Sequence, residues 1–247
     1  MSAKEVLHII TNEEIERIKA LGFETTGSTV PFVEFLNEYF PGFRIGEYLA
    51  ALENLLGSLT QVRITKELSF HESPPPMLII QYYSGDCEDD QTGLAFSQAF
   101  TRHGNEIVAE LDYLRIPESA RKKGLSKKVL NLNLQQYEAM GVAKIKLEAA
   151  LSNGGLVWAK AFFSATEPEE VKTILIKAEN KLTAEQFKFV ERVYDNYYNQ
   201  NPDGKAFPMN KWSQLAGMDQ ILQGSRWHGE LDLNNSDILT KFKNYVA

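Results

Sequence analysis

The residue types and spacings that could carry out chemistry are concentrated in one segment, residues 110–128. An apolar strand is predicted to end near residue 116 and a helix to begin near residue 125, and the loop between them carries three consecutive cations, Arg121, Lys122 and Lys123, before Gly124. The N-terminus of a helix presents unpaired N–H groups and the positive end of the helix dipole. A glycine lets a ligand approach the backbone closely. The pattern indicates a phosphate or pyrophosphate site, although a glycine after a basic run also occurs in ordinary turns before helices.

Two carboxylates precede this loop on the predicted strand. Glu110 and Asp112 are two residues apart, and residues spaced by two point to the same side of a strand. Such a pair could divide the work of a general base and of substrate binding. The alternative is that both belong to the polar face of a half-solvated strand, with Leu111 turned inward.

The loop resembles a known family motif. Arg121-x-x-Gly124-x-Ser126, between an apolar strand and a helix, resembles the acyl-CoA pyrophosphate loop of the GNAT superfamily of N-acetyltransferases, whose pattern is Arg/Gln-x-x-Gly-x-Gly/Ala. Ser126 is a mild departure from that pattern and still permits close approach of a ligand.

The sequence on both sides of the loop extends the resemblance. The strand ends in Leu114-Arg115-Ile116-Pro117, similar to the hydrophobic Val/Ile-Pro entry to the family's loop. The order that follows also matches: a helix, Gly141, a strand at residues 145–149, a turn with an asparagine, a helix and an aromatic residue. The resemblance covers roughly residues 58–180.

The resemblance implies how acetyl-CoA, or another acyl-CoA, would bind. Residues 111–116, with Leu114 and Ile116 among them, would offer backbone groups to the pantetheine arm, and Asn153 would hydrogen-bond to the same arm. The N–H groups of residues 122–126 would hold the pyrophosphate; these residues are Lys122, Lys123, Gly124, Leu125 and Ser126. The thioester would lie where this strand opens away from a parallel neighbour predicted at residues 144–149.

The resemblance also implies a reaction. An amine, on a small molecule or a protein, would attack the thioester carbonyl directly, without a covalent enzyme intermediate. This attack requires a neutral amine and hence a general base. Glu110 occupies the place where several histone-type members carry a catalytic glutamate, with Asp112 beside it. Other members place the base elsewhere or use water.

The later part of the pattern departs from the family. Many members use a tyrosine in the late helix to protonate the departing thiolate, and Trp158 stands in that register when Phe163 is aligned with the family's phenylalanine. An indole N–H is not a useful acid at neutral pH, and Phe162 replaces the usual glycine. These departures keep an alternative open: a catalytically inactive module of the same fold that binds a protein partner or a CoA-like ligand.

Helix and strand patterns predict the elements that would position this segment. Apolar periodicity and capping residues predict helices at residues 11–21, 32–40, 45–56, 126–140, 183–198 and 236–245, and a short helix that ends at residue 162. Strands are predicted at residues 62–70, 77–83, 94–102, 106–116, 144–149 and 172–176, with a further short run at residues 6–10. Residues 224–230 are interpreted as a candidate lid or partner surface, although packing against a core is the better interpretation.

These elements predict an α+β fold with a GNAT-like mixed, mostly antiparallel sheet flanked by helices. The predicted organisation has three parts: an N-terminal helical extension (1–57), an acyl-CoA-binding core (58–180) and a C-terminal helical cap (181–247).

Composition restricts the class of protein. The 247 residues carry 26 basic and 33 acidic side chains, a net charge of −7, which disfavours nucleic acid or an anionic membrane as a partner. No apolar run is long enough for a membrane span, and the N-terminus shows no secretory leader. Cys87 is the only cysteine, so no intramolecular disulfide can form. The four histidines show no metal-binding spacing. We therefore expect a cytoplasmic protein without a metal. The family resemblance implies that it is an acyltransferase, and by the same analogy a homodimer.

Overall fold

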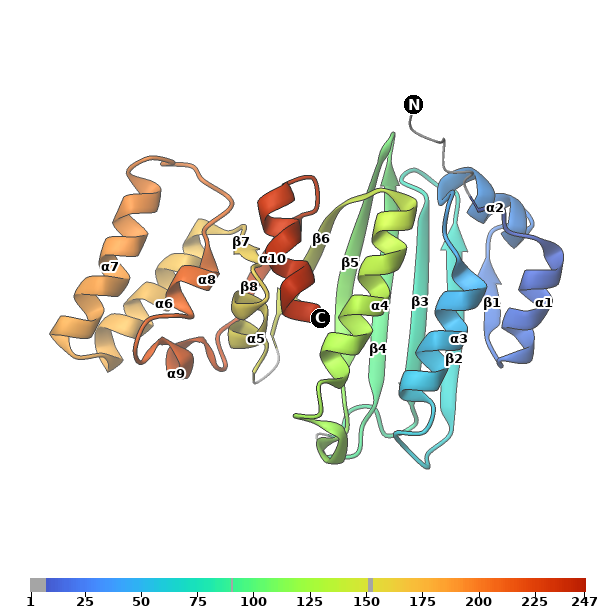
Figure 1. Cartoon of the computed structure of the whole chain (residues 1–247), viewed down its shortest axis with the longest axis horizontal. Coiled ribbons are helices and arrows are strands. Elements are labelled where there is room, and N and C mark those ends of the chain that lie inside the picture. The colour runs from blue at the N-terminus through green and yellow to red at the C-terminus, as the bar shows by residue number, and fades with distance from the viewer. Residues whose placement is uncertain (1–7, 90, 151–152) are drawn as a thin grey trace. The chain divides into compact units, whose positions relative to one another are not determined.

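The computed structural model of the chain describes residues 8–89, 91–150 and 153–247 (Figure 1). It contains two compact units, Met1–Ala143 with Val246–Ala247, and Lys144–Tyr245. Both units combine helices with strands, so the predicted α+β class is confirmed. The predicted three-part division of the chain stays a prediction. Among the described residues, no helix is both long and apolar enough to cross a bilayer.

The first unit contains a mixed sheet with the strand order β1-β2-β3-β4-β5. β1 is parallel to β2, and every other neighbouring pair in this unit is antiparallel. The strands are β1 (Glu24–Gly27), β2 (Ile64–His71), β3 (Met77–Ser84), β4 (Ala95–His103) and β5 (Glu106–Arg115). Gly104 turns the predicted β4–β5 hairpin with φ +62°. β1 was not predicted, because four mostly exposed residues carry no periodic apolar pattern.

Among the described residues, the α-helices of the first unit are α1 (Asn12–Ala20), α2 (Phe32–Tyr39), α3 (Ile45–Leu56) and α4 (Leu125–Met140). α3 and α4 contact each other and cross one face of the sheet (Figure 1). The ring of Phe100 on β4 lies 5.3 Å from that of Phe43 and 6.0 Å from that of Tyr137 on α4. These aromatic contacts place the core of the unit between α3, α4 and the sheet.

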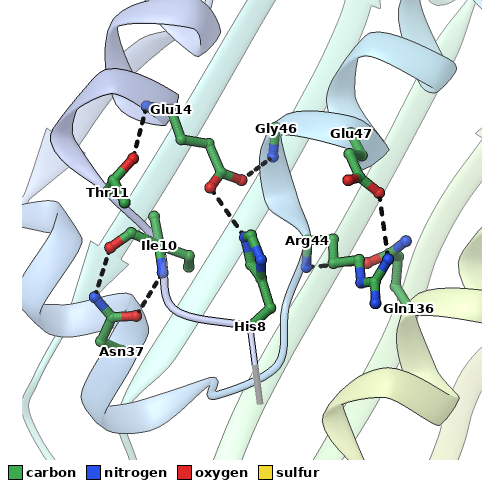
Figure 2. Close-up of polar contacts among 9 residues, drawn as sticks. All are labelled: His8, Ile10, Thr11, Glu14, Asn37, Arg44, Gly46, Glu47 and Gln136. Atoms are coloured by element: carbon green, nitrogen blue, oxygen red, sulfur yellow. Dashed lines mark hydrogen bonds and ion pairs between the residues drawn. The ribbon is translucent and has the colours of Figure 1, made fainter. Parts of the chain in front are cut away.

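Polar contacts fix the chain before α1 to the following helices (Figure 2). The Glu14 carboxylate accepts the Gly46 N–H at the start of α3 (2.9 Å) and lies 3.0 Å from His8 Nε2. The Asn37 amide both donates to and accepts from the Ile10 backbone, at 2.9 Å each. Residues 8–10 are therefore held by side chains rather than by strand pairing, so the predicted strand at residues 6–10 is wrong over residues 8–10; residues 6 and 7 lie outside the described residues.

A second set of contacts joins α3 to α4 (Figure 2). Gln136 on α4 accepts the Arg44 N–H at the N-cap of α3 through its Oε1 (3.2 Å). Arg44 also forms a 3.8 Å ion pair with Glu47 in the first turn of α3. A side chain of α4 thus holds the backbone at the residue that precedes α3.

The second unit has the strand order β6-β8-β7, with both pairs antiparallel. Its strands are β6 (Val142–Ala149), β7 (Ser164–Ala165) and β8 (Trp227–Asp232). Its helices are α5 (Gly154–Lys160), α6 (Pro168–Lys181), α7 (Ala184–Tyr198), α8 (Met209–Trp212), α9 (Met218–Leu222) and α10 (Ser236–Val246). A capping box between Thr183 and Gln186 starts α7 at the predicted position.

One prediction fails in this unit. Residues 172–176 belong to α6 and not to a strand, because the buried residues Val171, Ile174 and Ala178 follow the helical period from a proline in the first turn. For residues 224–230, the preferred interpretation, packing against a core, is confirmed at Trp227. Most of them enter β8, where Trp227 is fully buried and Gly229 makes room for its ring.

Candidate functional site

The two candidate carboxylates lie on one strand of the first unit. Glu110 and Asp112 are exposed on β5 on either side of the buried Leu111. The β4–β5 register pairs Ser97 with Tyr113 and Gln98 with Leu111, which leaves Asp112 as the extra residue of a β-bulge. A bulge bends its strand and redirects a side chain. The structure therefore brings both carboxylates to the solvent side of β5.

Asp112 has a structural partner that sequence reasoning missed. The Ser97 hydroxyl on β4 donates a hydrogen bond of 3.0 Å to Asp112 Oδ2. Although Asp112 retains exposed surface, the sheet removes part of the water around its carboxylate, and this desolvation raises the pKa of Asp112, while the Ser97 hydrogen bond lowers it in part. Only the hairpin register brings Ser97 to Asp112, so strand pairing was the signal that could have found it.

The predicted phosphate loop leads into α4 through two left-handed residues. Lys122 has φ +61° and Gly124 has φ +74°. Gly124 is the N-cap of α4, and no side chain caps this helix end. A Cβ atom at Gly124 would meet nothing within 4 Å. The glycine therefore serves the backbone conformation, and the space beside it is open to a ligand.

The cations of the loop differ in their roles. Arg121 donates from Nε to the Ile116 carbonyl (2.8 Å) and so closes the base of the loop. Lys122 and Lys123 are exposed beside the helix N-terminus. Two further exposed lysines, Lys127 and Lys128, follow in the first turn of α4. They were not among the predicted site residues, although they are adjacent to the motif.

The remaining predicted cofactor residues of the first unit follow from the same loop. Leu114 is half-buried near the end of β5, and Ile116 is buried just after it. Leu125 and Ser126 are half-buried at the start of α4. The structure thus brings the predicted loop residues together around one helix N-terminus.

An acidic loop lies against the entry to this segment. Arg115 Nη1 donates to the carbonyls of Cys87 (3.1 Å) and Glu88 (2.5 Å). Asp86 and Asp89 accept hydrogen bonds within the loop itself, chiefly from Ser84 and Thr92 for Asp86 and from the Thr92 and Gln91 backbone for Asp89, and these lower the pKa of each. The two carboxylates therefore order their own loop. Asp90 lies outside the described residues.

The predicted late-helix residues belong to the second unit. Asn153 is the exposed N-cap of α5, and its side chain caps no backbone group. Trp158 packs edge-on against Phe163, with ring centroids 5.3 Å apart. Phe162 has φ +69°, a left-handed conformation that favours glycine, at the position where the superfamily pattern carries glycine.

A surface groove of about 430 Å³ lies between α3 and α4 in the first unit. Its lining includes Lys128 but none of the predicted catalytic or cofactor-binding residues. We therefore do not assign it to the candidate site. Among the described residues, no group of three or more His, Cys, Asp or Glu side chains is arranged to hold a metal ion.

Comparisons with known proteins add no family. No protein-family model matches the chain, and no curated protein matches it significantly. The resemblance to the N-acetyltransferases therefore depends on the motif residues and on their structural setting.

Proposed function

We propose that this protein is a GNAT-like acyltransferase that moves an acetyl or other acyl group from acyl-CoA to an amine. The observation that carries the proposal is the uncapped N-terminus of α4, which begins at left-handed Gly124 directly after three cations. Backbone N–H groups and cations at a helix N-terminus bind phosphate groups. Phe162 gives separate support. It has the left-handed backbone conformation that glycine adopts readily, and it stands where the superfamily pattern has glycine.

The loop residues would bind the diphosphate of the acyl-CoA. Lys122, Lys123 and the first-turn N–H groups of α4 supply positive potential, and the open space beside Gly124 admits an anion. Arg121 stabilises the loop, because its Nε–H donates a hydrogen bond to the Ile116 carbonyl at the start of the loop. When bound, the acyl-CoA supplies the activated thioester that an amine can attack.

Asp112 and Glu110 would prepare the amine. A nearby carboxylate can remove a proton from an ammonium group, and a raised pKa makes that carboxylate a stronger base. Because desolvation raises the pKa of Asp112 and the Ser97 hydroxyl fixes the position of its carboxylate, we assign the role of base to Asp112. Glu110, on the same exposed side of β5, would bind the cationic substrate. This assignment reverses the order that the family register implies, in which Glu110 is the first candidate.

A specific contact favours a second candidate function. Trp158 packs on Phe163 where many superfamily members have an acid, and the indole cannot donate a proton to a thiolate. A non-catalytic module that retains the CoA-binding loop would have this feature. Such a module would bind acyl-CoA without turnover.

A transfer assay separates the two functions. Thiol release from acetyl-CoA is followed with a panel of polyamines, lysine peptides and small amines, for the unchanged protein, Asp112→Asn and Glu110→Gln. The enzyme proposal expects amine-dependent release, a loss of about 100-fold or more in kcat for Asp112→Asn, and mainly a raised KM for Glu110→Gln. Binding of acetyl-CoA without release for any amine would support the module instead.

A further inference from the structure

In the part of the chain that the structure describes, the core of the first unit contains polar side-chain atoms without hydrogen-bond partners. Gln98 on β4 and Asn133 on α4 are fully buried, and Tyr137 on α4 is 1% exposed. Within the described residues, neither amide atom of Gln98 has a hydrogen-bond partner, and the same holds for Asn133 Nδ2 and the Tyr137 hydroxyl. Buried polar groups in folded proteins are nearly always hydrogen-bonded to protein or to ordered water.

Rotation of the amides does not remove these unpaired groups. The Tyr48 hydroxyl donates to Asn133 Oδ1 at 2.9 Å. Exchange of the oxygen and nitrogen of Asn133 would leave the oxygen unpaired in place of the nitrogen. Both ends of the Gln98 amide are unpaired, so its exchange changes nothing. The packing of the side chains, and not the choice of which amide atom is oxygen and which is nitrogen, therefore leaves these groups unpaired.

The fold places Gln98 and Asn133 at one level of the core, with Tyr137 one turn further along α4. α4 returns along the sheet from the end of β5 (Figure 1), and β4 is antiparallel to β5, so α4 and β4 run in the same direction. The Phe100 and Tyr137 rings are in contact. Two residues before Phe100, about 7 Å along the strand, is Gln98 on the same face. One turn before Tyr137, about 6 Å along the helix, is Asn133.

Asn133 and Tyr137 are also near each other. The Asn133 amide partly offsets the effect of burial, which raises the pKa of Tyr137. Asn133 Nδ2 and the Tyr137 hydroxyl are thus close to each other, although they do not form a complete hydrogen bond. A small molecule that both donates and accepts would complete such an arrangement.

We propose that Gln98, Asn133 and Tyr137 form an internal hydration site that binds one or more ordered water molecules between β4 and α4. A water needs two to four polar partners in a buried site, and these side chains supply amide donors, an amide acceptor and a hydroxyl. We choose water rather than a larger ligand because the neighbours of Asn133 and Tyr137, namely Tyr48 and Phe100, are themselves fully buried. The proposal is independent of the acyltransferase proposal.

Tyr137→Phe is the sharpest variant, because it removes only the hydroxyl. If water bridges that hydroxyl, the folding equilibrium constant falls about fivefold, the value of one hydrogen bond. If the hydroxyl is unpaired, its removal leaves the constant unchanged or raises it. Tyr83→Phe, in which the lost hydroxyl lies at the half-exposed face of β3 and is 3.5 Å from Glu67, is the control.

Direct detection of the water completes the test. Magnetic relaxation dispersion of water nuclei on the full chain counts long-lived internal waters. The proposal expects loss of at least one such water in both Tyr137→Phe and Gln98→Leu, and no loss in Tyr83→Phe. An unchanged count in both variants would overturn it, and so would a high-resolution crystal structure of the unchanged protein in which Gln98 bonds directly to Asn133 with no water between β4 and α4. That crystal structure also decides the question if Gln98→Leu fails to fold.

Discussion

At the residue scale, Asp112 is the most informative side chain of the candidate site. It is the bulged residue of β5 and takes a hydrogen bond from Ser97 across the hairpin. Two effects oppose each other there, because desolvation raises its pKa and Ser97 lowers it, and desolvation is the larger. A carboxylate that resists ionisation in this way is suited to accept a proton. The same property also has a cost in folding stability.

The pH dependence of stability tests this property of Asp112. Because its folded pKa is raised, Asp112 favours folding below its unfolded pKa, and that contribution is lost as the pH rises through the folded pKa. We expect Asp112→Asn to be at least as stable as the unchanged protein at about pH 7 and to lose this advantage at about pH 3. Urea denaturation at both pH values measures the difference.

Ser97→Ala provides the second arm of that experiment. It removes the hydrogen bond that lowers the pKa of Asp112, so the loss of stability with rising pH should grow. A lower stability of Asp112→Asn than of the unchanged protein at neutral pH would show that the fold favours the ionised carboxylate, which contradicts a raised pKa.

At the element scale, the sequence predicts those elements whose ends are marked by local chemistry. Thr11 accepts the Glu14 N–H at the start of α1, the Thr183–Gln186 capping box starts α7, and Gly141 at φ +69° ends α4. The phosphate loop was found for the same reason, since its glycine and cations are adjacent in sequence. Features that depend on distant pairing were not found: β1, the strand role of β8, and the Ser97 contact to Asp112.

Lys66, a residue that no sequence pattern marks as important, connects several elements of the first unit. Lys66 on β2 lies 2.6 Å from Glu53 on α3 and donates to the Leu21 carbonyl at 2.9 Å. Its ammonium also lies over the rings of Phe23 and Tyr82, at 5.9 and 5.6 Å. Lys66 thus joins the loop after α1, α3 and two strands.

Lys66→Met tests this role. It keeps the aliphatic length but leaves the partly buried Glu53 without its cation, and we expect a loss of about 2 kcal/mol in the free energy of unfolding. Urea denaturation measures it. Lys19→Met, which breaks a surface pair with Glu16, is the matched control and should change the value by less than about 0.5 kcal/mol. Equal effects of the two variants would contradict the role of Lys66.

At the scale of the whole molecule, the charge of the candidate site opposes the charge of the chain. The net charge is −7, yet five of the eight residues 121–128 are basic. Such a local concentration of positive charge in an acidic protein is expected to attract a polyanion, and attraction between exposed charges weakens with added salt. No match to a known family supports the site, so its electrostatics provide an independent test.

The salt dependence of acetyl-CoA binding measures that attraction. We expect affinity for acetyl-CoA to fall as salt rises from about 0.05 to 0.5 M, and Lys123→Ala to lower the affinity several-fold with a smaller salt dependence. Lys241→Ala, on the exposed part of α10, is the control and should leave both unchanged. Affinity that does not respond to salt would mean that the loop does not bind the phosphates.

The most direct test of the acyl-CoA site is a calorimetric titration with acetyl-CoA of the unchanged protein, Gly124→Glu and Gly104→Glu. The two glycines form a matched pair, because each has positive φ and open space where a Cβ would stand, while they lie in loops at opposite ends of β5. We expect saturable binding of acetyl-CoA in the micromolar range that Gly124→Glu abolishes and Gly104→Glu retains. Absence of binding to the unchanged protein, or equal binding to both variants, would contradict it.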